Sequence, residues 1–241
     1  DVCPCCQGAC EDLVTLVGNA GSQKVVVGLC PQCGWIGYLD RPTTNWLEQF
    51  YREDWDAGHK DLETSGHWSD GEDPPVKKRA PSRNTQTLLS LVGRLELDHG
   101  GTRVLEIGCG FGGALAALKE IGFKHLVGVE GSLHRARSAA ARTGARVHTG
   151  DFISPALQAA LASDGPFDLI FSSHVLEHVA DPLAFLSAAR SLQRPDGNLI
   201  ISMPNQLRDP AAAIIFFLPH LHSLTPHALT TLLARAGYDV G

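Results

Sequence analysis

The segment Val104–Gly113, with the sequence VLEIGCGFGG, constrains the fold of this 241-residue chain more than any other. Its apolar residues Val104, Leu105 and Ile107 predict a buried strand, which gives way to glycines and then to an Ala/Leu-rich helix. Glycines at such a turn let backbone amides approach an anionic or zwitterionic ligand at the helix N-terminus. The segment therefore predicts that a nucleotide-like ligand binds at the end of a buried strand.

Strand-like and helix-like segments alternate from Thr85 to the end of the chain. The expected strands are Arg103–Ile107, Leu126–Glu130, Arg146–His148, Phe167–Ser172 and Leu199–Met203. Helices are expected at Thr85–Leu95, after the glycines as far as Gly122, and at Ser132–Thr143, Ser154–Asp164, Asp181–Leu192 and Thr225–Ala236, with a turn at Pro195–Gly197. Three of these helices start with Ser, Thr or Asp followed by proline, a helix-start signal. The alternation predicts a doubly wound, mostly parallel α/β sheet.

Two CxxC pairs occupy the first part of the chain, which holds six of the seven cysteines. The pairs are Cys3 with Cys6 and Cys30 with Cys33. Each pair can place two thiolates on one tight turn, and two such turns can close a tetrahedral zinc site. A site with four thiolates leaves no position for water and is therefore structural. The sequence predicts a small zinc-ribbon module over residues 1–40.

Cys5 and Cys10 are spare thiols, and either of them could replace Cys6 as a zinc ligand. Unliganded cysteines or a redox-active CxxC pair are the alternatives to a zinc site. A redox pair of the thioredoxin type would open a helix in a βαβ unit, and this chain has no such pattern around its CxxC pairs. Zinc is therefore favoured.

The bulk composition argues against two kinds of partner. The net charge of -6 does not suit a surface devoted to polyanions, so no nucleic acid is expected. The longest apolar run, residues 211–218, is much shorter than the roughly 20 residues that a membrane span needs. The sequence has no charged-then-apolar leader, and thiols stay free in a reducing cytosol, so we expect a cytoplasmic protein. Because residue 1 is Asp and not Met, we also expect a trimmed chain.

Residues 41–84 are expected to connect the ribbon to the α/β domain at residues 85–241. Aromatic residues at helical spacing, among them Trp46 and Phe50, predict a connecting helix that packs on a core. Residues 56–83 are polar and rich in Pro and Gly, which predicts a linker or a lid. The basic cluster at residues 77–79 is interpreted as a solvated run.

Polar side chains follow the ends of successive predicted strands, where ligands of such sheets bind. Glu106 precedes the glycines, and Glu130 ends the second strand, where its carboxylate can accept both hydroxyls of a ribose. Asp151 follows the third strand and can accept from an adenine amine, with Phe152 beside it as an apolar face. Ser172 and Ser173 end the fourth strand. The glycines also match GxGxxG, so a nicotinamide-dependent dehydrogenase is a remote alternative.

These residues lie in an ordered series of blocks that resembles the class I S-adenosylmethionine-dependent methyltransferases. The blocks are LEIGCGFGG (105–113), VGVEGS (127–132), TGDF (149–152), FDLIFSSHVLEHVADP (167–182), RPDGNLIISMPN (194–205) and HLHSLTPHALTTLLARAGYDV (220–240). The resemblance covers residues 85–241 and implies a Rossmann-like methyltransferase fold. The front of the chain is similar to family members with an N-terminal zinc-binding segment of the CPxC…CxxCG type.

The resemblance implies that the chain binds S-adenosylmethionine. It implies Gly108 and Gly110 at the methionine end of the cofactor, Glu130 on the ribose, and Asp151 and Phe152 at the adenine. The full expected set of cofactor-binding residues is Glu106, Gly108, Gly110, Glu130, Gly131, Ser132, Asp151, Phe152 and Ser173. For each of them a purely structural role, such as tight packing of glycine or a helix cap by an acid, is the alternative.

The segment His174–His178 reads HVLEH, which matches the HxxEH pattern of some zinc peptidases. Hydrolysis is disfavoured because the segment directly follows a sheet strand and no further carboxylate in a clear helical context offers a third ligand. Some quinone-pathway O-methyltransferases resemble this segment and hold a divalent ion there. They have an acid where this chain has His174, which weakens the case for an ion.

We expect transfer of a methyl group to a small-molecule acceptor, at oxygen, carbon or nitrogen, in a biosynthetic pathway. His174 and His178 are the candidate bases, since histidine suits proton removal near neutral pH. His220 and His222 are weaker candidates, and helix packing or pocket lining is the alternative for all four.

An alternative function is an inactive methyltransferase-like module that assembles with a protein partner through its zinc ribbon. The family's sheet closes with a final hairpin, and this chain ends at Gly241 before one, so we expect the hairpin to be missing.

Overall fold

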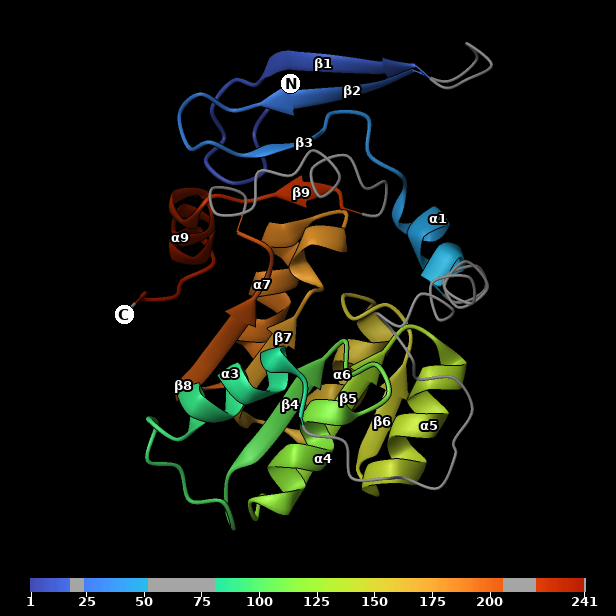
Figure 1. The fold of residues 1–241 in the computed structure, drawn as a ribbon, viewed down its shortest axis with the longest axis vertical. Helices are drawn as coiled ribbons and strands as arrows, with labels where there is room; N and C mark the ends of the chain where they lie inside the picture. The colour runs from blue at the N-terminus through green and yellow to red at the C-terminus, as the bar shows by residue number, and fades with distance from the viewer. Residues whose placement is uncertain (18–23, 52–80, 206–219, 241) are drawn as a thin grey trace. The chain divides into compact units, whose positions relative to one another are not determined.

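The computed structural model describes residues 1–17, 24–51, 81–205 and 220–240 (Figure 1). The chain forms two compact units. The first, here called the ribbon unit, consists of Asp1–Thr44, His174–Ser191 and Ser202–Gly241. The second, here called the sheet unit, consists of Asn45–Ser173 and Leu192–Ile201. The segment with both candidate bases thus groups with the cysteine-rich N-terminus.

The sheet unit is built on five strands in the order β6-β5-β4-β7-β8. Their bounds are β4 (Arg103–Ile107), β5 (His125–Glu130), β6 (Arg146–Thr149), β7 (Phe167–Ser173) and β8 (Gln193–Ser202). The pairs β4–β5, β4–β7 and β5–β6 are parallel. This arrangement confirms the predicted doubly wound α/β fold. The central strand is β4, the strand that leads into the glycines.

Helices flank these strands, and Figure 1 shows α4 and α5 running along the sheet. The helices of the sheet unit are α3 (Arg83–Val92), α4 (Gly113–Glu120), α5 (Leu133–Thr143) and α6 (Pro155–Asp164). Capping explains several of their ends: Ser132 Oγ accepts from the amide of Arg135, and Gly144 ends α5 in the left-handed conformation. Ser154, an expected cap of α6, makes no such side-chain bond.

Apolar side chains from the helices and strands form one core of the sheet unit. Its buried members include Leu88, Val92, Val104, Leu115, Leu118, Phe123, Leu126, Leu169 and Phe171. The core fixes the two elements on either side of the glycines, because Val104 lies in β4 and Leu115 in α4. Burial of such side chains is worth about 1.5–3 kcal/mol each, so this core holds the loop between two rigid elements.

The expected turn at Pro195–Gly197 falls inside β8, which begins six residues before the predicted strand start at Leu199. The chain still bends there, since a Cβ on Gly197 would lie 2.7 Å from Cγ of Gln193, four residues earlier. Strand β8 lies at the edge of the sheet. A proline is tolerated at an edge because its missing N–H costs no ladder hydrogen bond, so this boundary was predicted wrongly.

The ribbon unit contains a second sheet in the order β1-β2-β3-β9, whose pairs are antiparallel. Its strands are β1 (Glu11–Val17), β2 (Lys24–Leu29), β3 (Ile36–Tyr38) and β9 (His222–Ser223). The unit also contains α7 (Pro182–Leu192) and α9 (Pro226–Arg235), capped by Asp181 and Thr225. Strand β9 was not predicted. It adds a segment from the far end of the chain to the N-terminal ribbon.

The connecting helix α1 spans Thr44–Gln49, with Trp46 54% exposed and Leu47 buried. Trp46 stacks on Phe50 with the ring centroids 5.2 Å apart, so the helix buries only part of its aromatic face. The predicted lid, the basic cluster at residues 77–79 and the apolar run at residues 211–218 lie outside the described residues. Among the helices of the described ranges, none has the length and apolar character to cross a bilayer.

Candidate functional site

The glycine loop, residues 108–113, takes a shape that only glycine adopts without strain. Gly108, Gly110 and Gly112 have φ angles of 78°, 52° and 74°, in the left-handed region. The amides of Gly108 and Cys109 both donate to the carbonyl of Val129, at 2.8 and 2.9 Å, which ties the loop to β5. The loop is therefore a fixed feature that opens into the N-terminus of α4.

Glu130, the expected ribose ligand, lies at the end of β5 and contacts this loop. Its Oε2 accepts from the amide of Gly110 at 2.9 Å, and its Oε1 accepts from the amide of Ser132 at 2.9 Å. One carboxylate thus joins the glycine loop to the first turn of α5. Each oxygen of an ionised carboxylate carries two lone pairs and can accept more than one hydrogen bond.

The expected adenine-side residues follow β6 and are also tied to β5. The amide of Gly150 donates to the carbonyl of Glu130 at 3.3 Å. Asp151 Oδ1 accepts from the amide of Ile153 at 3.3 Å, and Phe152 is 5% exposed. Phe152 is thus mostly buried among protein atoms. The structure brings this turn and Glu130 together, as expected for residues that follow successive parallel strands.

Glu106 is a buried acid beside the glycine loop, with an exposed fraction of 5%. Its Oε2 has no hydrogen-bond partner among the described residues. Burial raises the pKa of this carboxyl well above its usual range; the nearby Glu130 charge acts in the same direction, and the backbone amide of Leu115 opposes it. Such a position favours the neutral form of an acid unless a cation comes to pair with it.

The remaining expected cofactor residues lie on the same edge of the sheet. Ser132 is 1% exposed and caps α5, and a Cβ on Gly131 would lie 3.4 Å from Cβ of Tyr51. Ser173 ends β7, and the neighbouring Ser172 donates to the carbonyl of Ile107 at 3.1 Å. All nine residues therefore gather at the carboxyl ends of β4, β5, β6 and β7. Ligands of open α/β sheets bind at this edge, where the strand order reverses.

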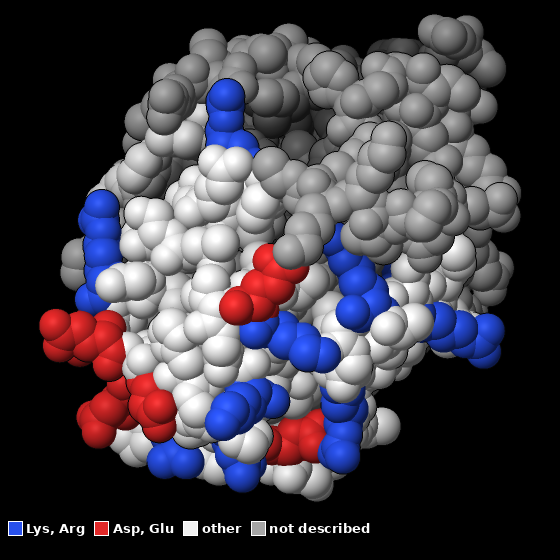
Figure 2. All heavy atoms as spheres, turned by 60° about the horizontal axis from the view of Figure 1, so that its bottom comes forward, with Lys and Arg blue, Asp and Glu red and all other residues white. Residues whose placement is uncertain are grey.

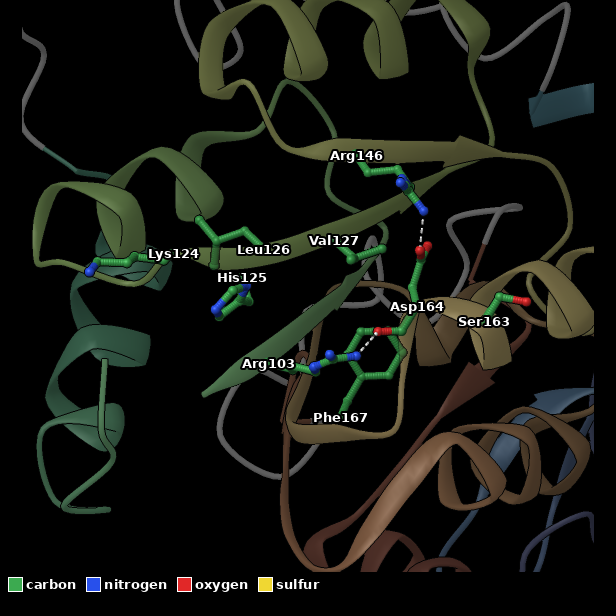
Figure 3. A pocket seen from close by; sticks show the side chains of 9 residues that line it. All are labelled: Arg103, Lys124, His125, Leu126, Val127, Arg146, Ser163, Asp164 and Phe167. Carbon is green, nitrogen blue, oxygen red and sulfur yellow. Dashed lines mark hydrogen bonds and ion pairs between the residues drawn. The ribbon is translucent and has the colours of Figure 1, made fainter. Parts of the chain in front are cut away.

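A shallow pocket of about 420 Å³ lies at the opposite, amino-terminal edge of the same sheet (Figure 3). Arg103, Arg146 and Phe167 line it, and they begin β4, β6 and β7. Its arginines are already engaged: Arg103 donates to the carbonyl of Asp164 at 2.8 Å, and Arg146 pairs with the Asp164 carboxylate. It is therefore not the expected cofactor site.

Acidic and basic side chains are interspersed on the face of the molecule drawn in Figure 2. Among the described residues on that face, Lys and Arg do not form one continuous basic surface.

In the ribbon unit, the two CxxC pairs come together. The four sulfur atoms of Cys3, Cys6, Cys30 and Cys33 lie within 4.8 Å of one another. Cys3 Sγ is 3.5 Å from Cys33 Sγ, and Cys6 Sγ is 3.4 Å from Cys30 Sγ. A compact set of four sulfurs, three of them on buried residues, fits the tetrahedral thiolate site that zinc prefers. These are the four ligands predicted from the sequence.

The spare thiols do not join this group. Cys5 is fully buried at 0% exposure, and Cys10 lies at the surface of the same turn region with intermediate burial. Neither is among the four sulfurs that converge. The geometry therefore favours Cys6 as the fourth ligand.

The ribbon unit also contains a cluster of His174, Glu177, His178 and His220, here called the histidine cluster. Glu177 is 1% exposed, and its Oε1 lies 3.3 Å from His174 Nδ1 and 3.9 Å from His178 Nε2. The His178 and His220 rings are 4.8 Å apart between centroids. His174 itself has a φ of 55°, an uncommon backbone conformation for a non-glycine residue.

Electrostatic coupling in this cluster follows from burial. Burial by itself raises the pKa of Glu177, but the His174 side chain and the His178 charge outweigh it, so the net shift is downward. The Glu177 carboxylate in turn raises the pKa of His174, against the effect of burial. Glu177 is thus an anion that increases the proton affinity of His174. The HxxEH spacing already placed this acid between the two histidines, although we expected only the histidines to act.

Both ring nitrogens of His222 are engaged. Nδ1 lies 3.1 Å from Nε1 of Trp35, and Nε2 lies 2.9 Å from the carbonyl of Val179. Burial, with the charge of Arg41, lowers the pKa of His222 to about 3. His222 is therefore a neutral structural residue, and its candidacy as a base does not fit the geometry.

Comparison with known proteins gives a consistent picture. Residues 76–240 match the model of a family described as a methyltransferase domain. A ubiquinone biosynthesis O-methyltransferase of Dinoroseobacter shibae is 35% identical over 156 residues, which cover 58% of this chain and 60% of that protein. The ubiquinone biosynthesis O-methyltransferase of Ruegeria pomeroyi is 30% identical over 200 residues, which cover 73% of this chain and 78% of that protein.

A solved structure shares the fold. Magnesium protoporphyrin IX methyltransferase from Synechocystis PCC 6803, crystallised with bound SAH, superposes with a TM-score of 0.57 at 17% identity. The superposition covers 83% of this chain and 91% of that one.

The cysteine geometry makes a prediction about metal content. Cys33→Ser should lose the bound zinc and lower the melting temperature, because a structural zinc site contributes directly to folding free energy. Metal content per chain is measured by mass spectrometry and melting by calorimetry. Cys10→Ser is the matched control and should keep the zinc. A Cys10→Ser protein without zinc, together with a Cys6→Ser protein that retains it, would contradict the assigned ligands.

The buried Glu106 carboxyl makes a second prediction, about stability and pH. Because its pKa is raised in the folded state, the stability it contributes is complete below its unfolded pKa and is lost as pH rises toward the folded value. Glu106→Gln does not titrate, so its stability relative to the parent should grow by about 1.4 kcal/mol per pH unit between the unfolded and the folded pKa of Glu106.

Urea unfolding of the cofactor-free protein at pH 5, 6 and 7 measures this advantage. The exposed Glu120→Gln serves as control. A difference that is constant with pH would mean that Glu106 is ionised in the folded protein.

Proposed function

Because the chain belongs to the methyltransferase domain family, we propose that it transfers the methyl group of S-adenosylmethionine to a hydroxyl oxygen of a small biosynthetic intermediate. The observation that carries the proposal is the convergence of the glycine loop, Glu130 and Glu106 at the carboxyl edge of the sheet. The choice of oxygen rests on the names of the two relatives, which are O-methyltransferases. This chain spans 60% of the first of them.

The chemistry of the sheet-unit residues fits the parts of this cofactor. Glu130 offers an anionic acceptor for ribose hydroxyls, and the unpartnered Oε2 of Glu106 suits the ammonium of the methionine portion. Asp151 can accept from the adenine amine. When bound, the cofactor supplies a methyl group on a positive sulfur, which is a good electrophile. The protein then has to orient the acceptor and remove one proton.

We assign proton removal to the histidine cluster. In this assignment the Glu177 carboxylate, whose Oε1 lies 3.3 Å from Nδ1 of His174, favours the tautomer with its proton on Nδ1, so that Nε2 of His174 takes the proton of the acceptor hydroxyl. The oxygen then bonds to the methyl carbon, and the electrons of the broken C–S bond remain on sulfur. His178 is the second candidate base. It follows His174 by four residues and faces the same carboxylate at 3.9 Å.

The same cluster supports a second way of activating a hydroxyl. The ligand atoms of Glu177, His178 and His220 lie within 4.8 Å of one another, a donor set that suits a divalent ion. Such an ion would lower the pKa of a bound hydroxyl and replace the histidine base. Metal content distinguishes the two. Two ions per chain, of which one is lost in His220→Ala, would favour the metal, and zinc at the cysteines alone favours the base.

An inactive binding module that docks on a protein through the zinc ribbon is the other function that the sequence leaves open. The left-handed glycine loop and the hydrogen bond that holds Glu130 beside it argue for cofactor binding. The two functions are separated by incubating the protein with methyl-labelled S-adenosylmethionine and a panel of catechols, phenols and aliphatic alcohols. Label in a small-molecule product supports the enzyme.

Glu130→Ala should weaken cofactor binding by about 100-fold or more, since it removes two hydrogen bonds to a charged acceptor worth about 1.5–3 kcal/mol each. Titration calorimetry with S-adenosylhomocysteine measures the Kd. Glu130→Gln keeps one acceptor oxygen and should lie between the parent and the alanine variant. An unchanged Kd in a folded Glu130→Ala protein would remove the ribose assignment.

The base assignment predicts a pH effect. His174 must be neutral to accept a proton, so the rate should rise with pH through the pKa of His174, which Glu177 raises. Glu177→Gln removes that charge, so the rising limb should move to lower pH while the maximal rate falls. His174→Ala should lower kcat by about 100-fold or more and leave the Kd for S-adenosylhomocysteine within a factor of two.

The pH profile of kcat, measured on an acceptor from the panel, checks both variants. A rising limb that stays in place in Glu177→Gln would show that another group titrates.

A further inference from the structure

A line of buried hydrogen bonds leads from the second cysteine turn to the histidine cluster, entirely within the ribbon unit. It starts at Trp35, which follows Cys33 by two residues and is 1% exposed. The Trp35 carbonyl accepts from the amide of Cys30 at 2.8 Å, so the turn and the tryptophan move as one piece. The indole Nε1 reaches Nδ1 of His222 at 3.1 Å.

This contact settles the tautomer of His222. An indole N–H can only donate, so Nδ1 of His222 must accept and Nε2 must carry the proton. That proton is donated to the carbonyl of Val179 at 2.9 Å. Val179 directly follows His178 in the chain. The imidazole of His222, which is 1% exposed, therefore acts as a rigid link between the cysteine turn and the end of the HVLEH segment.

A second, backbone link runs beside the first. The amide of Leu221 donates to the carbonyl of Glu177 at 2.7 Å, and the carbonyl of Leu221 accepts from the amide of Tyr38 at 3.3 Å. Strand β3 approaches so closely here that a Cβ on Gly37 would lie 2.3 Å from the Leu221 carbonyl oxygen. The ribbon thus fixes Leu221, which is hydrogen-bonded to Glu177 and directly follows His220 in the chain.

The helix α9 and its capping residue also form hydrogen bonds with both cysteine turns. Its capping residue Thr225 donates to the carbonyl of Cys33 at 2.8 Å and accepts from the amide of Ala228. At its other end, Arg235 donates to the carbonyls of Pro4 and Cys5 at 2.8 and 2.6 Å. Both turns are therefore fixed to a helix that begins three residues after β9 ends. The geometry of the metal site and that of the 220–222 segment depend on one another.

We propose that Trp35 and His222 are positioning residues, through which the zinc ribbon sets the mutual geometry of Glu177, His178 and His220. The predicted effect of these residues on catalysis rests on the proposed function. Their predicted effect on the positions of the histidine side chains does not. The ribbon would then help to position the residues that accept the proton, through its hydrogen bonds to the HVLEH segment.

The test is Trp35→Phe in the full, zinc-loaded chain. Phenylalanine keeps most of the buried ring and removes the single N–H, so zinc content and the Kd for S-adenosylhomocysteine should stay within a factor of two. We expect the ring resonances of His178 and His220 to shift in NMR spectra of histidine-labelled protein. With an acceptor from the panel, kcat should fall by about tenfold because one buried hydrogen bond is lost, and KM should change less.

Tyr238→Phe is the matched control, because it also removes one partly buried hydrogen bond of the ribbon unit, from Tyr238 Oη to the carbonyl of Leu186. It should leave the His178 and His220 resonances in place. His222→Gln covers the case in which Trp35→Phe does not fold. The double variant should be no worse than the worse single one, because the two residues act in series.

The outcomes separate the two ideas. If Trp35→Phe shifts the His178 and His220 resonances, and the parent chain transfers no methyl group, the link is supported and the proposed function is overturned. Unshifted resonances and an unchanged kcat in folded Trp35→Phe and His222→Gln would overturn the link, whatever the activity of the parent.

Discussion

The hydrogen bonds of the Glu130 carboxylate hold the carboxyl edge of the sheet unit together. This carboxylate accepts from the amides of Gly110 and Ser132, so one side chain holds the glycine loop against the start of α5. Without it, two helix N-termini and a loop of left-handed glycines would have to keep their places through packing alone. The group that we propose to bind the ribose therefore also shapes the site that receives the rest of the cofactor.

The two buried acids Glu106 and Glu177 have pKa values shifted in opposite directions by their surroundings. Glu106 is buried without a full set of partners, and burial raises its pKa, which favours its neutral form in the absence of a cation. Glu177 is equally buried, but two histidines lower its pKa and keep it charged. The first suits recognition of a positively charged ligand, and the second suits the orientation of a base.

In the ribbon unit, the proposed zinc site is linked by hydrogen bonds to the histidine cluster of the same unit. Four sulfurs fix two turns, and the residues after the second turn continue into Trp35 and β3. Those residues bind the 220–222 segment through the indole N–H and through the ladder between Gly37 and His222. The histidine cluster therefore inherits its geometry from elements that lie far away in the sequence and close together in the fold.

Local patterns in the chain were enough to predict the strand–glycine–helix turn, the helix start at Thr225 and the two CxxC pairs, because periodicity, capping chemistry and CxxC spacing act over a few residues. They also predicted a doubly wound sheet, but not the order of its strands. Which distant side chains meet follows only from the way the elements pack in three dimensions. The Trp35–His222 contact joins residues 187 positions apart, and the cation that holds the first cysteine turn is Arg235. Such pairings depend on how whole elements pack, which no local pattern encodes.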